Sequence, residues 1–249
     1  MDLTSMDELT ANTDGVRYLI EGASAVTGLR RVLFTSSLLV CENGHVPKDE
    51  FEYCPPNLYG RSKMIGEQLV RSADVPFEWV IVRPTSIWGP WFEHSYKSFF
   101  QVINKGFYFH PGKDDIIKPK SYVGNTVHMM FSLLLEANGK SNHGVYYLAD
   151  YPQGNTREWA TEIARQLGKP SIRTIPLSIL RVVAMFGDEI KLLGKEFPIT
   201  SFRLGNMLTG GEYPVENTKE ITGALPYTLE RGVSETIEWM RQTDRKSVG

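Results

Sequence analysis

Residues 31–37 read RVLFTSS, and this stretch decides the fold of the chain. A short, continuous apolar run that ends in small hydroxyl residues is typical of a strand buried on both faces of a parallel sheet. Residues 55–73, PPNLYGRSKMIGEQLVRSA, predict a helix capped by Asn57, and residues 77–84, FEWVIVRP, predict a second buried strand that Pro84 ends. A strand, a helix and a strand in this order form the basic unit of a doubly wound α/β fold.

The segments on either side of this unit continue the α/β pattern. Apolar positions at near-helical spacing, polar caps and breaks at glycine and proline mark their limits. They predict helices over residues 6–26, 95–104, 125–137, 156–167 (capped by Thr156), 177–193 and 228–242, a strand over 144–149 and a frayed tail over 243–249. We therefore predict a first domain formed by residues 1–83 plus 143–150, and a second, mixed domain formed by residues 84–142 plus 151–249.

The composition argues against several classes of protein. With 249 residues, 41% hydrophobic and 22% charged, the chain is typical of a globular protein with a sizeable core. Its net charge of -2 gives no general attraction for nucleic acid or acidic membranes. The apolar stretch 177–193 is interrupted by Arg181, Asp188 and Glu189, and the acidic start MDLTSMDELT differs from a signal peptide. We therefore expect a soluble cytoplasmic protein that binds neither nucleic acid nor membranes.

The cysteine and histidine positions predict neither a disulfide framework nor a metal site. Cys41 and Cys54 have no cysteine or histidine at ligand spacing, so we interpret both as reduced thiols. His94, His110 and His128 lack carboxylate or histidine partners at metal-binding spacing. The sequence therefore predicts no bound metal.

Three polar side chains could meet at one edge of the predicted sheet. Tyr59 and Lys63 are four residues apart, so they share one face of the predicted helix. Ser37 follows the first strand at its carboxyl end, where open parallel sheets collect their active-site groups. A phenol is a poor base at neutral pH unless a neighbouring ammonium favours the phenolate, and a serine hydroxyl can hold a reacting alcohol or carbonyl. The alternative is that the three are ordinary loop and helix-surface residues.

Several stretches together resemble one enzyme family. RVLFTSS is followed by NLYGRSK, in which Tyr59 stands 22 residues after Ser37, and then by VIVRPTSIWGP at residues 80–90. Residues 120–130, KSYVGNTVHMM, and residues 225–240, LPYTLERGVSETIEWM, continue the similarity. In order and spacing these stretches resemble the extended short-chain dehydrogenase/reductase family, in particular its NAD-dependent epimerase/dehydratase branch, which acts on nucleotide sugars.

The resemblance implies a role for each matching residue. Tyr59 would be the general acid and base, Lys63 would bind the nicotinamide ribose of NAD or NADP and favour the phenolate of Tyr59, and Ser37 would hydrogen-bond the substrate oxygen. The resemblance further implies that Ser36, Pro84 and Thr85 contact the cofactor. The resemblance also implies a homodimer that uses the Tyr59 helix, with Met64, Gln68 and Arg71 near that face.

The largest departure from the family is a missing glycine-rich loop. Family members carry a first strand and a Gly-x-x-Gly-x-x-Gly loop that binds the dinucleotide pyrophosphate, and this sequence has none. The resemblance therefore implies a partial doubly wound, Rossmann-like parallel sheet that lacks its N-terminal strands and leaves an edge of RVLFTSS unpaired. It also implies that the mixed domain of residues 84–142 plus 151–249 binds the substrate. A fragment of a longer product, a separate N-terminal partner and a degenerate protein are the alternatives, and we favour the first. Alone, the chain should bind NAD too weakly for turnover, which isothermal titration would test.

Other departures from the family reduce the number of candidate reactions but do not identify the substrate. Leu38 and Leu39 stand where dehydratases of this branch carry an acidic pair, so dehydration is disfavoured and epimerisation or reduction remains. Ser86 stands where sugar-nucleotide members usually have asparagine beside the diphosphate. The basic candidates for binding phosphates are Lys113, Lys118, Lys120 and Arg203, of which Lys120 lies in the matching segment. A non-catalytic binding or scaffold protein with the same fold is the alternative function.

Overall fold

The computed structural model describes residues 4–45, 47–92, 95–192, 194–195 and 197–246, and it divides the chain into two compact units. The first unit comprises Met1–Ile87, Pro119–Pro152 and Glu212–Tyr227, and the second comprises Trp88–Lys118, Gln153–Gly211 and Thr228–Gly249. Residues 84–87, 119–142, 151–152 and 212–227 thus group with the first unit, although the sequence assigned them to the second domain. The reason is packing, since their helices lie against the main sheet.

The first unit is built on a parallel three-stranded sheet in the order β1-β2-β6. The strands are β1 (Arg31–Thr35), β2 (Glu78–Pro84) and β6 (Gly144–Leu148). Phe34 lies opposite Ile81, and Val82 lies opposite Tyr146. The structure confirms the strands expected from RVLFTSS, FEWVIVRP and the segment 144–149, with the first ending at Thr35.

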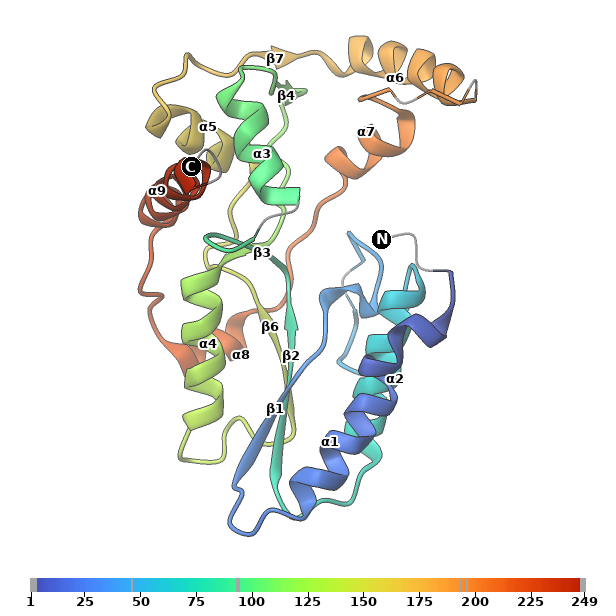
Figure 1. Cartoon of the computed structure of the whole chain (residues 1–249), viewed down its shortest axis with the longest axis vertical. Coiled ribbons are helices and arrows are strands. Elements are labelled where there is room, and N and C mark those ends of the chain that lie inside the picture. Colours follow the sequence, from blue (N-terminus) through green and yellow to red (C-terminus); the bar gives the residue numbers. More distant parts are fainter. Residues whose placement is uncertain (1–3, 46, 93–94, 193, 196, 247–249) are drawn as a thin grey trace. The chain divides into compact units, whose positions relative to one another are not determined.

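Helices cover both faces of this sheet (Figure 1). On one face lie α1 (Asp14–Ser24) and α2 (Leu58–Ser72), which enclose a core of Ala23, Phe34, Val70, Phe77, Trp79 and Ile81. On the other lie α4 (Val123–Leu135) and α8 (Glu216–Thr222), which enclose Val80, Val82, Met129, Leu133, Tyr146 and Leu148. Side chains of successive strand residues thus alternate between the two cores, as a sheet buried on both faces requires. The fold is α/β and Rossmann-like.

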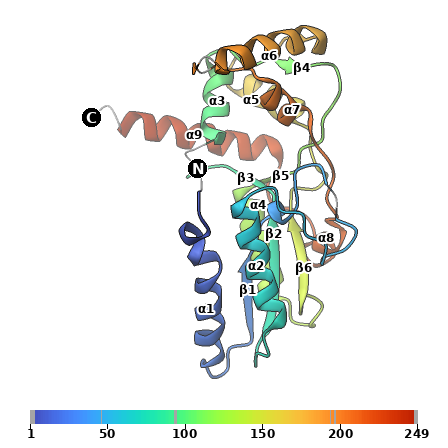
Figure 2. The ribbon, with the colours of Figure 1, turned by 90° about the vertical axis from the view of Figure 1, so that its right-hand side faces the viewer.

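The second unit packs helices around an aromatic core. Trp159 of α5 (Thr156–Gln166) stacks on Phe99 of α3 (Ser95–Asn104) with ring centroids 4.7 Å apart, and α5 also packs against α9 (Leu229–Lys246). A second pair, α6 (Leu177–Leu192) and α7 (Ser201–Leu208), packs together around Leu180, Ala184 and Leu204 (Figure 2). In this unit a two-stranded sheet joins β4 (His110–Pro111) to β7 (Thr174–Ile175). Another two-stranded sheet joins β3 (Ser86–Trp88), which begins in the first unit, to β5 (Lys120–Tyr122) of the first unit.

Several helix limits differ from the sequence expectations. The helix over residues 6–26 is divided into a 3-10 helix, η1 (Met6–Asn12), and α1, with the break at Thr13. Asn155 rather than Thr156 caps α5, because its Oδ1 accepts the Glu158 N–H at 2.7 Å. The segment expected to fray after residue 242 instead continues α9 to Lys246, while residues 247–249 lie outside the described part. No helix among the described residues is both long and apolar enough to cross a membrane.

Candidate active site

Tyr59 and Lys63 share one face at the start of α2. Asn57 caps this helix, with its Oδ1 accepting the Gly60 N–H at 2.8 Å. The Lys63 ammonium lies 5.8 Å from the centroid of the Tyr59 ring and donates to the carbonyl oxygen of Thr35 at 3.0 Å. Partial burial lowers the pKa of Lys63. The predicted Tyr59–Lys63 pair therefore exists as neighbouring side chains, and the lysine joins α2 to the end of β1.

The Thr35 carbonyl that Lys63 binds lies on the outer side of β1. The Arg30 carbonyl accepts the Glu78 N–H at 2.9 Å, and the Ser36 N–H donates to Val82 at 2.8 Å, so the backbone groups of these residues face β2. Along a strand the direction of these groups alternates, and the Thr35 carbonyl faces away from β2. Lys63 thus satisfies an acceptor on the side of β1 that no described strand pairs with.

Ser37 begins the turn that follows β1. Its Oγ accepts the Leu39 N–H at 3.1 Å and so caps the short 3-10 helix η2 (Leu38–Val40). This leaves the hydroxyl proton of Ser37 able to donate to another oxygen. The side chain is buried, with 9% of the residue exposed, because η2 packs directly on α2.

A glycine brings the Ser37 turn and the Tyr59 helix together. A Cβ placed on Gly60 would lie 2.0 Å from the carbonyl oxygen of Leu39, so only glycine allows this approach. Gly60 follows Tyr59, and Leu39 lies in the turn capped by Ser37. The structure therefore holds the two segments that carry the hydroxyl and the phenol in direct backbone contact.

A buried ion pair supports the same corner of the sheet. Arg83 of β2 and Glu67 of α2 form a bidentate pair at 2.7 and 2.9 Å, and both are almost fully buried. Glu67 also accepts the hydroxyls of Ser36 at 2.5 Å and Tyr53 at 2.9 Å. Burial acts to lower the pKa of Arg83, but hydrogen bonds and the charge of Glu67 outweigh it and raise that pKa. The Ser36 hydroxyl is thus used within the protein, so α2 is fixed to β1 and β2.

A hollow of about 290 Å³ opens beside Lys63. Thr35 and Ser36 from the end of β1, Lys63 from α2, and Asn12 and Val16 from the N-terminal helices are among its lining residues. The hollow therefore combines one cation, polar groups and an apolar wall within the first unit.

The other implied residues lie along the ends of β2 and β3. Pro84 is the last residue of β2, and Thr85 is buried with its hydroxyl donating to the Leu148 carbonyl at 2.8 Å. Ser86 begins β3, which pairs with the strand β5 that begins at Lys120. Thr85 thus serves the backbone of β6, whereas Ser86 and Lys120 lie on neighbouring strands and are both partly exposed.

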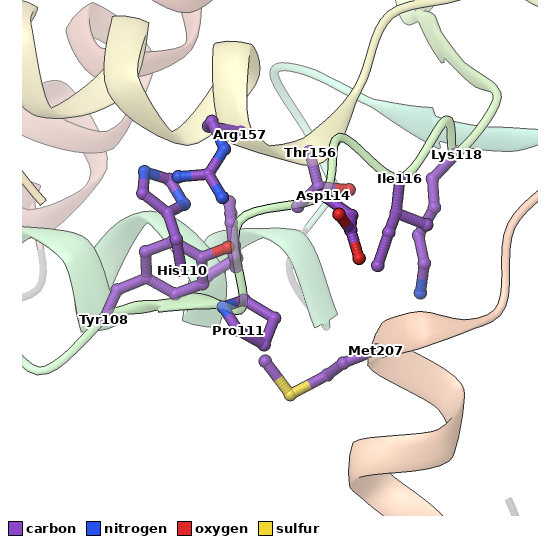
Figure 3. A pocket seen from close by; sticks show the side chains of 10 residues that line it. Tyr108, His110, Pro111, Asp114, Ile116, Lys118, Thr156, Arg157 and Met207 are labelled. Atoms are coloured by element: carbon purple, nitrogen blue, oxygen red, sulfur yellow. The ribbon is translucent and has the colours of Figure 1, made fainter. Parts of the chain in front are cut away.

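A separate cavity of about 190 Å³ lies within the second unit (Figure 3). The rings of Phe99 and Tyr108, with His110, form part of its wall, and Lys118 and Arg157 provide its cations. Burial raises the pKa of Tyr108 to about 12, and burial followed by the charge of Arg157 lowers the pKa of His110. The cavity therefore combines aromatic rings, two cations and the carboxylate of Asp114.

The remaining basic candidates differ in their surroundings. The Arg157 guanidinium pairs with Asp115 at 2.9 Å, and the Lys118 ammonium donates to the carbonyl of Asn206. Arg203 donates to the carbonyls of Phe197 and Pro198, and Lys113 is exposed. Of the basic residues selected from the sequence, Lys118 lines the cavity, and Arg157 is the cation of this cavity that the sequence did not reveal.

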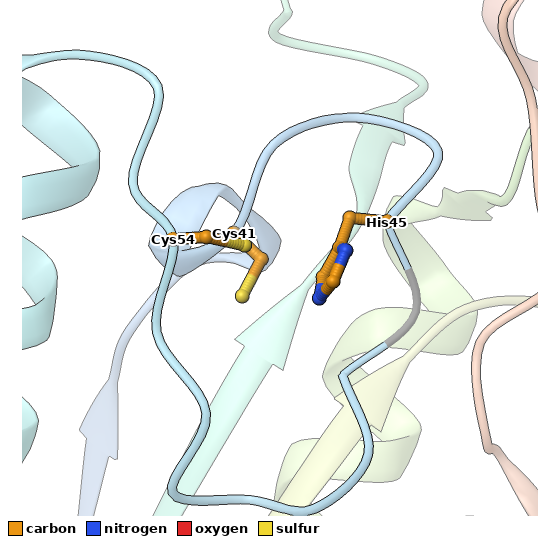
Figure 4. A group of neighbouring side chains, drawn as sticks. All are labelled: Cys41, His45 and Cys54. Carbon is orange, nitrogen blue, oxygen red and sulfur yellow. The ribbon is translucent and has the colours of Figure 1, made fainter.

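The structure also brings together a group that the sequence analysis missed. Ligand atoms of Cys41, His45 and Cys54 lie within 4.8 Å of one another (Figure 4). The expectation that the cysteines have no histidine at ligand spacing is therefore wrong, because the loop between β1 and α2 folds back on itself and brings His45 to both. The Cys-x-x-x-His spacing of Cys41 and His45 is the signal that could have indicated this cluster.

Comparisons with known proteins define the family. The parallel sheet with helices on both faces is that of an extended short-chain dehydrogenase/reductase of the NAD-dependent epimerase/dehydratase branch. A sequence model of the 3-beta hydroxysteroid dehydrogenase/isomerase family matches residues 2–179, and the chain belongs to this family.

Relatives and solved structures agree with this assignment. The chain is 29% identical over 244 residues to the UDP-glucose 4-epimerase of Vibrio cholerae, covering 94% of this chain and 70% of the relative. It is 27% identical over 236 residues to an Escherichia coli N-acetyl-alpha-D-glucosaminyl-diphospho-ditrans,octacis-undecaprenol 4-epimerase, covering 92% and 70%. The structure of UDP-glucuronic acid 4-epimerase from Bacillus cereus in complex with NAD has a TM-score of 0.67 at 13% identity, covering 94% of this chain and 69% of that one. This last likeness concerns the fold.

Proposed function

We propose that this protein is an NAD(P)-dependent epimerase that inverts the configuration at one carbon of a nucleotide sugar. The observation that carries the proposal is the arrangement at the start of α2. Lys63 lies beside the Tyr59 ring and the end of β1, while Gly60 holds Tyr59 against the turn that Ser37 begins. An acid/base group, a cation and a hydroxyl donor thus occupy one corner of the first unit.

The residues have distinct roles in the proposed reaction. The phenolate of Tyr59 accepts the proton of a sugar hydroxyl while the carbon that carries it becomes a carbonyl, and the phenol returns that proton when the alcohol re-forms. The Lys63 ammonium, 5.8 Å from the centroid of the Tyr59 ring, would bind the ribose of the dinucleotide. Ser37 donates its hydroxyl proton to the reacting oxygen while the Leu39 N–H occupies an acceptor position of its Oγ.

The residues around the hollow fit the nicotinamide-ribose end of a dinucleotide. Lys63 offers an ammonium for the ribose hydroxyls, and the hollow beside it is open enough for a ring. When bound there, the dinucleotide supplies the acceptor and donor of hydride at the reacting carbon. Pro84 and the backbone of Thr85 are the candidates for contact with the nicotinamide, whereas the Ser36 hydroxyl is engaged by Glu67.

Epimerisation is favoured over dehydration by the residues beside Ser37. Leu38 and Leu39 cannot transfer protons, and Leu38 packs against the cluster of Tyr147, Tyr213 and Val215. Both relatives described above are 4-epimerases, one acting on UDP-glucose and the other on a diphospho-linked N-acetylglucosaminyl lipid. These names support a sugar carried by a diphosphate as the substrate, for which Ser86 and Lys120 are our candidate contacts.

The test measures epimerisation with a matched pair of tyrosine variants. The protein, including any in-frame coding sequence upstream of Met1, is incubated with NAD or NADP and with UDP-glucose, UDP-N-acetylglucosamine or UDP-glucuronic acid. Chromatography then separates the 4-epimers. Tyr59→Phe should lose about 100-fold or more of the turnover, as expected for removal of a general acid/base. Tyr18→Phe changes an exposed tyrosine of α1 and should leave turnover unchanged.

The outcomes separate the proposal from its alternatives. Equal turnover by the wild type and Tyr59→Phe would contradict the catalytic role of Tyr59. Binding of a UDP-sugar without turnover would favour a non-catalytic binding protein, and failure to bind any of the three would contradict the substrate class. Light scattering tests the proposed homodimer. Its proposed face includes Met64 and Gln68, whereas Arg71 already pairs with Glu50 at 3.0 Å.

A further inference from the structure

A tight loop between the Ser37 turn and α2 gathers the two cysteines of the chain around one histidine. Cys41 and Cys54 form an isolated parallel β-bridge, held by the Cys54 N–H donating to Val40 at 3.0 Å. Gly44 adopts a φ of 84°, and the His45 N–H donates to the Glu42 carbonyl at 3.1 Å, which turns the chain back toward Cys41. The side chains of the three residues meet inside this loop (Figure 4).

The separations suit a small tetrahedral cation. The ligand atoms of Cys41, His45 and Cys54 all lie within 4.8 Å of one another. In tetrahedral zinc sites with bonds of about 2.3 Å to sulfur and 2.0–2.1 Å to nitrogen, ligand atoms are roughly 3.5–3.8 Å apart. The cluster therefore reaches zinc geometry by closing about 1 Å, which side-chain rotation can supply.

A carboxylate beside the histidine completes the arrangement. The Glu52 Oε1 lies 3.1 Å from Nε2 of His45, and the Glu52 Oε2 accepts the Lys48 N–H at 2.6 Å. When Nδ1 binds the metal, a carboxylate at the other ring nitrogen orients the ring, as is common in zinc sites. Glu52 therefore supports the site by orienting His45.

We propose that Cys41, His45 and Cys54 form a zinc site that staples the loop joining the Ser37 turn to the Tyr59 helix. Two sulfurs and one imidazole in a tetrahedral set are typical of Zn²⁺ and poorly suited to Mg²⁺ or Ca²⁺. Neither the family nor the epimerisation chemistry described above requires this site, and it stands independently of the proposed function.

Binding of Zn²⁺ requires deprotonated thiols, so it changes the protonation of the site. Burial, and next the hydrogen bond with Cys54, raise the pKa of Cys41 to about 12. The metal-free thiol of Cys41 therefore carries its proton near neutral pH, and binding of Zn²⁺ releases it.

The test titrates the reduced, purified full chain with Zn²⁺ in competition with a chromogenic chelator, and separately with Co²⁺. We expect one ion per chain and, with Co²⁺, the absorption of a tetrahedral thiolate complex. His45→Ala and Cys54→Ser should abolish both signals, and Glu52→Gln should weaken binding about 10- to 100-fold. His143→Asn is the matched control, because His143 is exposed and lies outside the cluster. Its backbone φ of 55° is one that asparagine tolerates.

The controls guard against loss of folding. Cys41 is fully buried, so the cysteine variant used is Cys54→Ser, and circular dichroism must show that each variant is folded. The Co²⁺ spectrum of the wild type is informative whatever the variants do. No binding by the reduced chain, binding that survives Cys54→Ser and His45→Ala in folded protein, or a Cys41–Cys54 disulfide whose reduction restores no metal binding would each overturn the proposal.

Discussion

At the scale of single residues, Ser37 has two separable roles. Its Oγ caps η2 by accepting the Leu39 N–H, and in the proposed reaction its proton is donated to the substrate. Ser37→Ala removes both, so we expect a loss of about 1 kcal/mol in the free energy of unfolding, typical of a lost cap, and a turnover at least about 100-fold lower. Denaturant titration and the epimer assay measure the two effects.

Ser37→Thr is the control for this prediction. Threonine keeps a hydroxyl, and the backbone φ of -156° at this position is extended, as β-branched residues favour. The variant should keep the cap and hence the stability, and retain measurable turnover. If Ser37→Ala lost stability but kept full turnover, Ser37 would be a capping residue alone.

At the scale of secondary-structure elements, the contact between η2 and α2 depends on Gly60. A methyl group at this position would meet the Leu39 carbonyl oxygen at 2.0 Å, and backbone cannot rotate away as a side chain can. We expect Gly60→Ala to cost about 1–3 kcal/mol, as overpacking does, and to lower turnover by moving Tyr59 away from the Ser37 turn. Thermal melting and the epimer assay provide the measurements.

Gly22→Ala offers the opposite expectation within the same unit. Gly22 lies in α1. Apart from the adjoining residues and the backbone of the helix itself, no atom lies within 4 Å of the position that an added Cβ would take. Replacement by alanine should therefore stabilise the protein by up to about 1 kcal/mol, because alanine loses less entropy on entering a helix. Equal effects of the two substitutions would show that the close approach at Gly60 is unimportant.

The elements around the site were predictable because local signals mark them. Asn57 caps α2, Pro84 ends β2, and the continuous apolar runs of both strands require burial on two faces. The helices α7 and α8 were not predicted, since they span only eight and seven residues. The loop that brings His45 to the cysteines depends on the φ of Gly44 and on bonds between distant residues, which spacing alone does not reveal.

Long-range packing explains the remaining differences. Helix α4 was expected in the second domain, yet Met129 and Leu133 pack on Val80 and Val82 of the main sheet. The buried pair of Glu67 and Arg83 was also not foreseen, because two charged residues 16 positions apart are ordinarily surface residues. Sequence indicated which residues could react, whereas the network that fixes them emerged from the packing.

At the scale of the whole molecule, titrating groups in both units set the dependence of stability on pH. Hydrogen bonds from Asn142 lower the pKa of Glu78, and those from Arg165 lower the pKa of Glu162. Each carboxylate therefore adds to the stability of the fold above its ordinary pKa, and this contribution is lost as pH falls. Burial lowers the pKa of His110, so its contribution is present above 6.5 and is also lost as pH falls. The contribution of Asp150 to stability changes with pH in the opposite direction.

Burial raises the pKa of Asp150 from 3.8 to about 6, although the Tyr122 N–H and the Asn125 amide donate to its oxygens. The folded protein therefore holds this proton more tightly than the unfolded chain does. The resulting stabilisation is fully present below 3.8 and is lost as pH rises through about 6. Relative to Asp150→Asn, the wild type should lose at most about 3 kcal/mol across this interval, or about 2–4 °C of Tm per kcal/mol.

Because the other groups titrate equally in both proteins, the difference in Tm between wild type and Asp150→Asn isolates this carboxyl. From pH 4 to pH 7 the Tm of the wild type should therefore fall steadily relative to that of Asp150→Asn. The Tm of the exposed control Asp74→Asn should keep a constant difference from that of the wild type. A difference that is flat over this range would mean that Asp150 ionises as readily in the folded protein as in the unfolded chain. Its two amide donors would then outweigh its burial, and the corner where β5, α4 and β6 meet would be polar and hydrated rather than dry.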